Sequence, residues 1–303
     1  MARVSFAGVK RVAIAVGWVV LFIAIGVGIT IGISELVPGW GGQEWFVART
    51  GVYEVIGFGF STWLVGRVLK KYSWTELGWN RPAVTPWLKG LALGAVMAAA
   101  AIGLAVVLDG ARVHFTGDWS LWPRVALPLS IGLICAALGE EFGFRGFPLR
   151  RLSDGFGVVP AMLLLAILFG LGHAKNPSAT VFSSINVALA AVWLSFAFFS
   201  AGGMQLAWGA HFGWNAGLAI LFDAPVSGYT FHVPVVEYTP GTHPWVDGGA
   251  FGPEGGVVST VALLAGAVWL LTRPSAFSGQ PAALSDSVSP SPEGSGGQGV
   301  RTA

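Results

Sequence analysis

The chain has 303 residues, of which 54% are hydrophobic and only 11% are charged, whereas a soluble domain carries about 25% charged residues. This composition predicts a membrane protein with several spans. A formal net charge of +2, with no basic run and no nucleic-acid-binding pattern, argues against a nucleic-acid partner. The single cysteine, Cys135, lies in an apolar stretch and cannot form an internal disulfide.

Eight hydrophobic segments approach the length of about 20 residues that a helix needs to cross the hydrocarbon core. The first follows three basic residues, as a signal peptide would, but its apolar run is too long for one and no cleavage site follows. We therefore predict an all-α fold, a polytopic membrane bundle of about eight transmembrane helices. The expected spans are residues 12–33, 50–66, 88–108, 125–151, 157–174, 180–200, 204–222 and 257–272.

Lys and Arg residues give the bundle a predicted orientation, because they concentrate in cytoplasmic loops. With the N-terminus inside, thirteen of them fall on the cytoplasmic side and four on the other side, namely Arg49, Arg112, Arg124 and Lys175. An even number of spans then returns the chain to the same side. Both termini are predicted to be cytoplasmic.

The chain divides into two parts of different composition. Residues 1–272 form the predicted integral membrane domain. Residues 273–303 are rich in Ser, Gly and Pro, and such a segment cannot bury enough apolar surface to fold. We expect a disordered cytoplasmic tail there.

Three short motifs place ionisable side chains in predicted spans, where a charge costs roughly 2.5–3.5 kcal/mol and marks a functional site by default. Counting about 1.5 Å per helical residue from the turn at 153–155 puts Glu140 and His173 at similar depth. His211 reaches that depth if the fourth and fifth helices extend past the cytoplasmic surface. The fifth helix would then end early, leaving 175–177 within the membrane, which is tolerable only if that backbone lines a cavity. The motifs are Glu140-Glu141-Phe142-Gly143-Phe144-Arg145, Phe169-Gly170-Leu171-Gly172-His173 and His211-Phe212-Gly213-Trp214-Asn215.

The two glutamates of the first motif have different expected roles. Glu141 and Arg145 are spaced i, i+4 in the order that favours a helical ion pair. Glu140 points about 100° away around the helix and has no such partner. We hypothesise that Arg145 holds Glu141 and that Glu140 is free to act as a base. The alternative is that the three residues merely satisfy one another at the membrane interface.

The histidines carry the remaining chemistry. His211 and Asn215 share a helical face, where both can bind a metal, orient a water or stabilise an oxyanion. Their spacing is similar to that of the zinc-binding H-E-x-x-H helix, but the internal glutamate is missing, so Glu140 is the natural base. His173 alone is a weak signal, since a lone histidine on an apolar helix is more often a hydrogen-bonded packing residue. Glu54 is a further acid in a span, outside any motif.

Taken together, the motifs resemble those of the CAAX-protease and bacteriocin-processing intramembrane proteases, the CPBP family. This family includes the type II CAAX prenyl endopeptidases and the lysostaphin-resistance-A-like bacterial proteins. Its signatures E-E-x-x-x-R, F-x-x-x-H and H-x-x-x-N match Glu140-Glu141 with Arg145, Phe169 with His173, and His211 with Asn215. The resemblance covers roughly residues 75–272, the predicted protease core.

The resemblance implies hydrolysis of a peptide bond in a cavity open to the cytosolic leaflet, in a membrane-associated peptide or protein that could be prenylated or of bacteriocin type. Glu140 would activate a water, while His173, His211 and Asn215 would bind a metal or stabilise the tetrahedral intermediate. Zinc held by His173, His211 and Glu140 is one version. Bacterial members of the family suggest a bacterial plasma membrane.

Two other classes remain open from the sequence. A proton-coupled transporter could use Glu140, Glu141, His173 and His211 as a protonation relay, although no internal repeat is visible in the sequence. A non-catalytic immunity or scaffold protein could bind a peptide without cleaving it. The sequence contains no signal for the oligomeric state or for the identity of the substrate.

Overall fold

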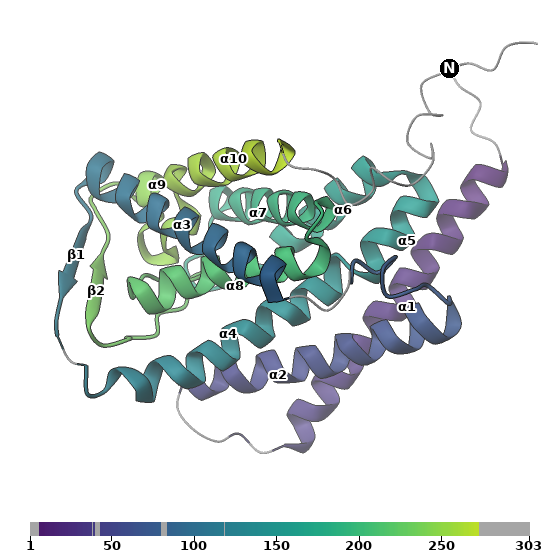
Figure 1. Ribbon diagram of the computed structural model, residues 1–303, viewed down its shortest axis with the longest axis horizontal. Helices are drawn as coiled ribbons and strands as arrows, with labels where there is room; N and C mark the ends of the chain where they lie inside the picture. Colours follow the sequence, from purple (N-terminus) through teal and green to yellow (C-terminus); the bar gives the residue numbers. More distant parts are fainter. Residues whose placement is uncertain (1–5, 38, 40–42, 80–83, 118, 273–303) are drawn as a thin grey trace, which may run out of the picture.

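The computed structural model describes residues 6–37, 39, 43–79, 84–117 and 119–272 as a predominantly helical protein (Figure 1). The predicted tail at 273–303 lies outside these residues. In chain order the helices are α1 (Phe6–Leu36), α2 (Gln43–Ser61), the π-helical segment η1 (Thr62–Leu69), α3 (Val84–Asp109), α4 (Trp122–Phe144), α5 (Phe147–Phe156), α6 (Val158–Gly172), α7 (Val181–Phe199), α8 (Gly203–Ala216), the π-helical segment η2 (Gly217–Leu221), α9 (Pro244–Asp247), the short 3₁₀ segments η3 (Gly249–Phe251) and η4 (Pro253–Gly255), and α10 (Val257–Leu271).

Each of the eight predicted spans contains a helix, but the helices differ in their ability to cross a membrane alone. Five helical stretches among the described residues are long and apolar enough to do so, namely 8–36, 48–69, 84–109, 122–156 and 181–199. Two more, α6 and α10, are apolar but have only 15 residues each, about 22 Å of helix. The protein is an integral membrane protein, while the number of eight spans and the cytoplasmic termini stay predictions.

One predicted helix is interrupted. The span predicted over 125–151 lies within the stretch 122–156, which is long enough to cross a membrane, but inside it α4 ends at Phe144 and α5 begins at Phe147. Gly146 leaves the helical region with ψ near −104°. Pro148 follows, and a proline lacks the N–H that would continue the helical hydrogen bonds. The first motif therefore sits in the last turn of α4.

The all-α expectation has one small exception at the end of the bundle opposite α5 (Figure 1). Strands β1 (Arg112–Phe115) and β2 (Val236–Thr239) pair antiparallel, with Arg112 opposite Thr239 and Phe115 opposite Val236. The ribbon joins the segment after α3 to the long segment after η2. It lies outside the predicted spans and does not disturb the helix bundle.

Glycines allow the site-bearing helices to pack unusually close to their neighbours. A Cβ on Gly94 of α3 would lie 2.1 Å from the carbonyl oxygen of Ala210 in α8, and one on Gly213 would lie 2.2 Å from that of Leu91 in α3. Gly139 of α4 packs equally tightly, since its Cβ would meet the Cβ of Glu54 in α2 at 2.7 Å. Small residues at such crossings let backbones approach in membrane helices. These contacts hold α8 against α3 and α4 against α2.

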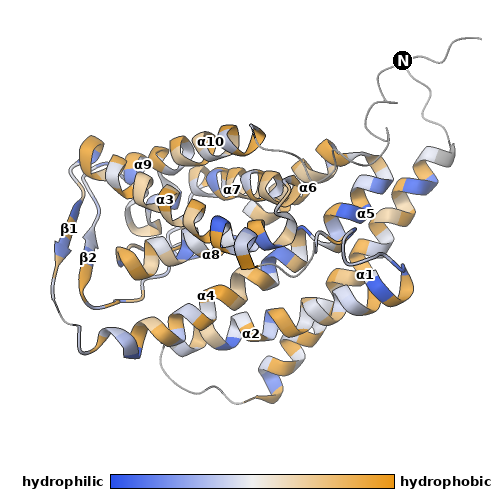
Figure 2. Cartoon of the chain, in the orientation of Figure 1, coloured by the Kyte–Doolittle hydropathy of each residue, from blue (hydrophilic) through white to orange (hydrophobic). Residues whose placement is uncertain are grey.

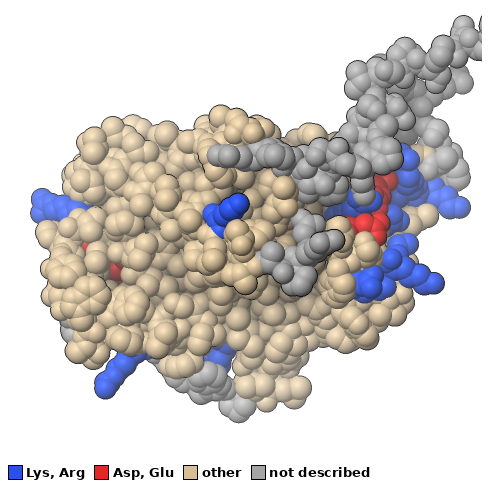
Figure 3. All heavy atoms as spheres, in the orientation of Figure 1, with Lys and Arg blue, Asp and Glu red and all other residues tan. Residues whose placement is uncertain are grey.

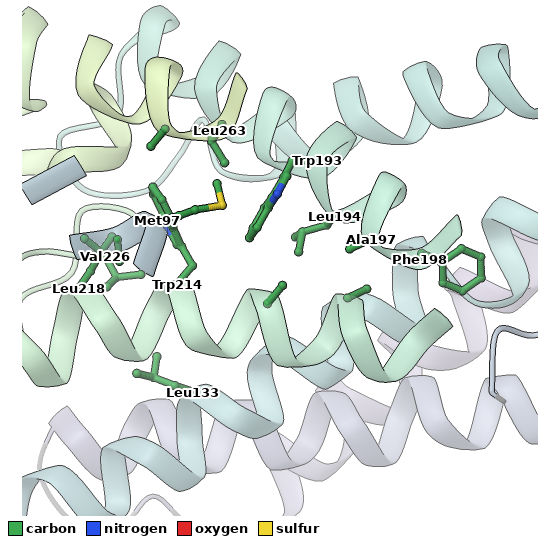
Figure 4. Close-up of a cluster of buried hydrophobic side chains, with 14 of the residues drawn as sticks. Met97, Leu133, Trp193, Leu194, Ala197, Phe198, Trp214, Leu218, Val226 and Leu263 are labelled. Carbon is green, nitrogen blue, oxygen red and sulfur yellow. The ribbon is translucent and has the colours of Figure 1, made fainter. Parts of the chain in front are cut away.

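The core lies between these pairs and is mainly apolar. Met97 of α3, Trp193 of α7 and Trp214 of α8 meet there with Leu133 of α4 (Figure 4). The helices are hydrophobic over most of their length, and α8 lies deep in the bundle (Figure 2). Burial inside the protein explains why α8 can carry polar residues that lipid would not tolerate.

Charged side chains are concentrated at one end of the molecule. On the face shown in Figure 3, Lys and Arg gather with a few acids over α1 and α5, and the body over α3, α7 and α10 is almost uncharged. This separation is the pattern of a protein whose body lies in the hydrocarbon region.

Candidate active site

The polar motif residues surround one cavity inside the bundle. It has a volume of about 220 Å³ and is lined from α2, α4, α6, α7, α8 and two connecting segments. Four of the six predicted site residues line it, namely Glu140, His173, His211 and Asn215. Glu141 and Arg145 do not line the cavity, because they are fully buried behind it. The motifs thus meet, as their depths predicted.

The predicted ion pair within the first motif is present. An Arg145 guanidinium nitrogen lies 3.3 Å from a carboxylate oxygen of Glu141, and the side chains are 1% and 0% exposed. Arg145 also donates a 3.3 Å hydrogen bond to the carbonyl oxygen of Ala191 in α7 and stacks on the Phe169 ring, 4.9 Å from its centroid. The pair therefore ties α4 to α6 and α7.

His211 adds a partner that the sequence did not indicate. Its Nδ1 lies 2.9 Å from the Glu141 oxygen that also faces Arg145. Since a carboxylate only accepts hydrogen bonds, Nδ1 carries the proton and donates it. The other ring nitrogen, Nε2, lies 3.5 Å from Glu140. Glu141 thereby orients the His211 ring, and the ring faces the carboxylate of Glu140 across the cavity.

His173 is oriented by its own helix. Its Nδ1 lies 2.8 Å from the carbonyl oxygen of Phe169, which can only accept, so Nδ1 holds the proton. The neutral ring then offers Nε2 as an acceptor in the cavity that His173 lines. The Phe169 ring lies next to both histidines. Its centroid is 4.6 Å from that of the His173 ring and 6.3 Å from that of the His211 ring.

The segment that follows His173 meets the condition set for non-helical backbone within the membrane only at Asn176. α6 ends at Gly172, and Asn176 in the connection to α7 lines the cavity. The Asn176 side chain donates a 3.1 Å hydrogen bond to the carbonyl oxygen of Ser227. Asn176 thus borders the cavity, whereas its neighbours Lys175 and Pro177 are exposed on the surface of the protein.

Several polar residues of the cavity and its wall were not among the predicted site residues. Glu54 lines the cavity and interacts electrostatically with Glu140. Glu254 accepts hydrogen bonds from the Trp214 indole at 2.9 Å and from the Ser227 hydroxyl at 2.9 Å. Asn186 of α7 holds the same wall by donating to the carbonyl oxygens of Glu254 and Gly256, at 3.0 and 2.8 Å. The sequence signals for these residues were an acid (Glu54) or an amide (Asn186) in an apolar span, and an acid (Glu254) within a Gly-rich run.

The lining of the cavity bears on the implied access from the cytosolic leaflet. Its lining beyond the motifs comes from the first turns of α2, at Phe46 and Thr50, from Asn176, and from 226–231 after η2. The Lys and Arg distribution assigns all of these segments to the non-cytoplasmic side. In that orientation, the cavity extends from the site toward the outer leaflet. Access from the cytosolic leaflet and the orientation of the bundle therefore both stay predictions.

The residues named for zinc do not form a metal site in this arrangement. Among the described residues, no three His, Cys, Asp or Glu side chains lie close enough together to hold one ion, and a catalytic zinc takes three protein ligands. The Nδ1 atoms of His173 and His211 are both engaged in hydrogen bonds, an arrangement that metal-binding histidines also have. The separation of the three side chains is therefore the observation against zinc in this arrangement.

Acids and imidazoles that face a small cavity within apolar helices can move protons while lipid and protein exclude bulk water, as an intramembrane hydrolase or a proton-coupled carrier requires. Residues 120–217, which carry all six predicted site residues, match the family model described as type II CAAX prenyl endopeptidase Rce1-like. This match confirms the resemblance found in the motifs for this part of the chain. The family is one of proteases. No curated protein matches the chain.

We expect Arg145→Gln to destabilise the protein by about 3–5 kcal/mol, because it leaves the buried carboxylate of Glu141 without a counter-charge. Arg150→Gln is the matched control. That residue forms the same i, i+4 pair with Asp154 at 3.3 Å, but the side chains are 25% and 31% exposed, and such pairs contribute at most about 1 kcal/mol. Unfolding by denaturant in detergent micelles measures both. Equal losses would contradict the anchoring role of Arg145.

Proposed function

We propose that the protein is an intramembrane endopeptidase that hydrolyses a peptide bond with a water activated by Glu140. The observation that carries the proposal is the division between the glutamates. Glu141 is buried with Arg145 and His211, whereas the Glu140 side chain is 28% exposed and faces the cavity. A general base needs a free carboxylate within reach of water and substrate, and Glu140 meets that requirement.

The proposed reaction begins with the attack of water on the scissile carbonyl carbon. Glu140 takes a proton from the water as the oxygen–carbon bond forms. The tetrahedral intermediate then collapses, the carbon–nitrogen bond breaks, and Glu140 returns the proton to the leaving nitrogen. General acid–base catalysis of this kind contributes about 10²–10⁴-fold in rate.

The remaining polar groups have roles that follow from their donors and acceptors. The free Nε2 of His173 is an acceptor, which suits it to orient the attacking water. Asn215 lies one turn beyond His211 on α8 and lines the same cavity, so its amide N–H groups are available to the developing oxyanion. The protonated form of His211, next to Glu141, would donate from Nε2 to the same oxygen. Glu141 and Arg145 position these groups.

The substrate we propose is a membrane-associated peptide or protein, cleaved by the enzyme in the plasma membrane of a bacterium. The cavity lining includes the carboxyl side chains of Glu54, Glu140 and Glu254, and no Lys or Arg among the described residues. Acidic surroundings favour a neutral or basic peptide segment over an acidic one. A lipid group on the substrate is compatible with the family name and is not required by the cavity.

We expect Glu140→Gln to abolish cleavage while the protein accumulates normally, because the amide cannot accept the proton from water. Quantitative profiling of protein N-termini in host cells, with wild type against the variant, would show a small set of N-termini lost. Glu237→Gln on β2, an exposed acid far from the motifs in the chain, should leave that set unchanged. Identical profiles for wild type and Glu140→Gln would remove the protease proposal and favour a carrier or a scaffold.

We expect cleavage to persist after removal of metal ions, since the described donors do not gather around one point. The assay uses purified protein and a peptide that spans a cleavage site found in the N-terminal profile, before and after treatment with a strong chelator. Metal content is measured on the same samples. Activity that disappears with the metal and returns with added Zn²⁺ would show that a metal ion takes part.

A further inference from the structure

A second cavity lies on the outside of the bundle, between α3, the α7–α8 connection and α10. It is an open groove of about 880 Å³, bordered along α3 from Pro86 to Ala100 and along α10 from Ala262 to Leu270. Its floor and walls are almost entirely aliphatic, and none of the six motif residues borders it. This groove is separate from the candidate active site.

The length of the groove matches one leaflet of a bilayer. Lys89 and Ala100 are 11 residues apart on α3, which is about 16 Å of helix. Half of a hydrocarbon core is about 15 Å thick. Both residues are exposed on the helix surface. A chain that started beside Lys89 and followed the groove would therefore end near the middle of the membrane.

The polar end of the groove carries a positive charge. Lys89 is the single charged side chain among the described residues that line it, and it forms no salt bridge within the described part of the chain. Trp269 borders the same end from the last turns of α10 and is 41% exposed, as amphipathic rings at the membrane interface usually are. The Lys and Arg distribution places this end on the cytoplasmic side, where anionic lipids are enriched.

We propose that the groove binds one anionic phospholipid of the cytoplasmic leaflet, with its phosphate at Lys89 and an acyl chain along α3 and α10. The apolar walls match the hydrocarbon chain, and the lone ammonium matches the headgroup charge. A zwitterionic lipid would fill the same groove without a net charge to complement Lys89.

Two side chains, Met97 and Trp193, would separate the bound chain from the candidate active site. Met97 borders the groove, and Trp193 borders the catalytic cavity. Met97 reaches from α3 toward Trp193 of α7 (Figure 4), and a Cβ on Gly266 would touch both, at 2.4 and 2.9 Å. The acyl chain would thus support the wall that separates the two cavities.

Native mass spectrometry of the delipidated full chain tests the proposal. The protein is titrated with phosphatidylglycerol or with phosphatidylcholine of the same acyl chains. We expect one phosphatidylglycerol per chain in preference to phosphatidylcholine. Lys89→Gln should weaken the binding of phosphatidylglycerol about fivefold, which is the contribution of one lysine near an anionic membrane. The binding of phosphatidylcholine should stay unchanged.

Two matched pairs of variants separate this site from general lipid contact. Ala100→Trp fills the groove and should prevent binding of both lipids, whereas Ala99→Trp, an exposed neighbour that does not line the groove, should bind as wild type does. Lys10→Gln, which removes an exposed lysine of α1, is the control for the loss of one positive charge in Lys89→Gln. Equal affinity of wild type for the two lipids, unchanged binding in Lys89→Gln, or equal losses in Ala99→Trp and Ala100→Trp would each overturn the proposal. If Ala100→Trp does not fold, Ala265→Trp on α10 replaces it.

Discussion

The carboxylate of Glu141 is the point on which the candidate site depends. It is fully buried and shared between the guanidinium of Arg145 and the imidazole of His211. A buried charge is tolerated only with partners of this kind, and here the partners come from the end of α4 and the middle of α8. One side chain therefore fixes the relation of two helices, the direction of the His211 ring and the environment of Glu140. Glu141, which is buried, meets a structural need, and its neighbour Glu140, which faces the cavity, meets a chemical one.

The glycine contacts make that arrangement possible. α8 can bring His211 and Asn215 into the interior because Gly209 and Gly213 let its backbone lie against α3, and α4 can bring Glu140 close to Glu54 because Gly139 lets it lie against α2. Close backbones leave a small cavity rather than a wide channel, with a volume of about 220 Å³. Polar side chains can gather in such a space without contact with lipid.

Much of the site could be predicted from the sequence, because spacing along a helix is a local property. The pairing of Glu141 with Arg145 and the common depth of Glu140 and His173 both follow from helix geometry. The role of His211 as a partner of Glu141 could not be predicted, since it depends on the packing of α8 against α4 in three dimensions. The same is true of Glu254, which reaches the cavity through the turns after η2, and of the side toward which the cavity extends. Pro148 is a local signal for the break at Gly146, but the hydropathy of the segment favoured one continuous span.

The central claim is that Glu141 supports the structure and Glu140 performs the chemistry. Thermal unfolding of Glu140→Gln and Glu141→Gln, each purified in the same detergent, tests this division most directly. We predict that Glu141→Gln lowers the unfolding temperature strongly, because Arg145 is left buried without a counter-charge, and that Glu140→Gln unfolds at the temperature of the wild-type protein. A loss of stability in Glu140→Gln as large as that in Glu141→Gln, or a Glu141→Gln variant as stable as wild type, would contradict it.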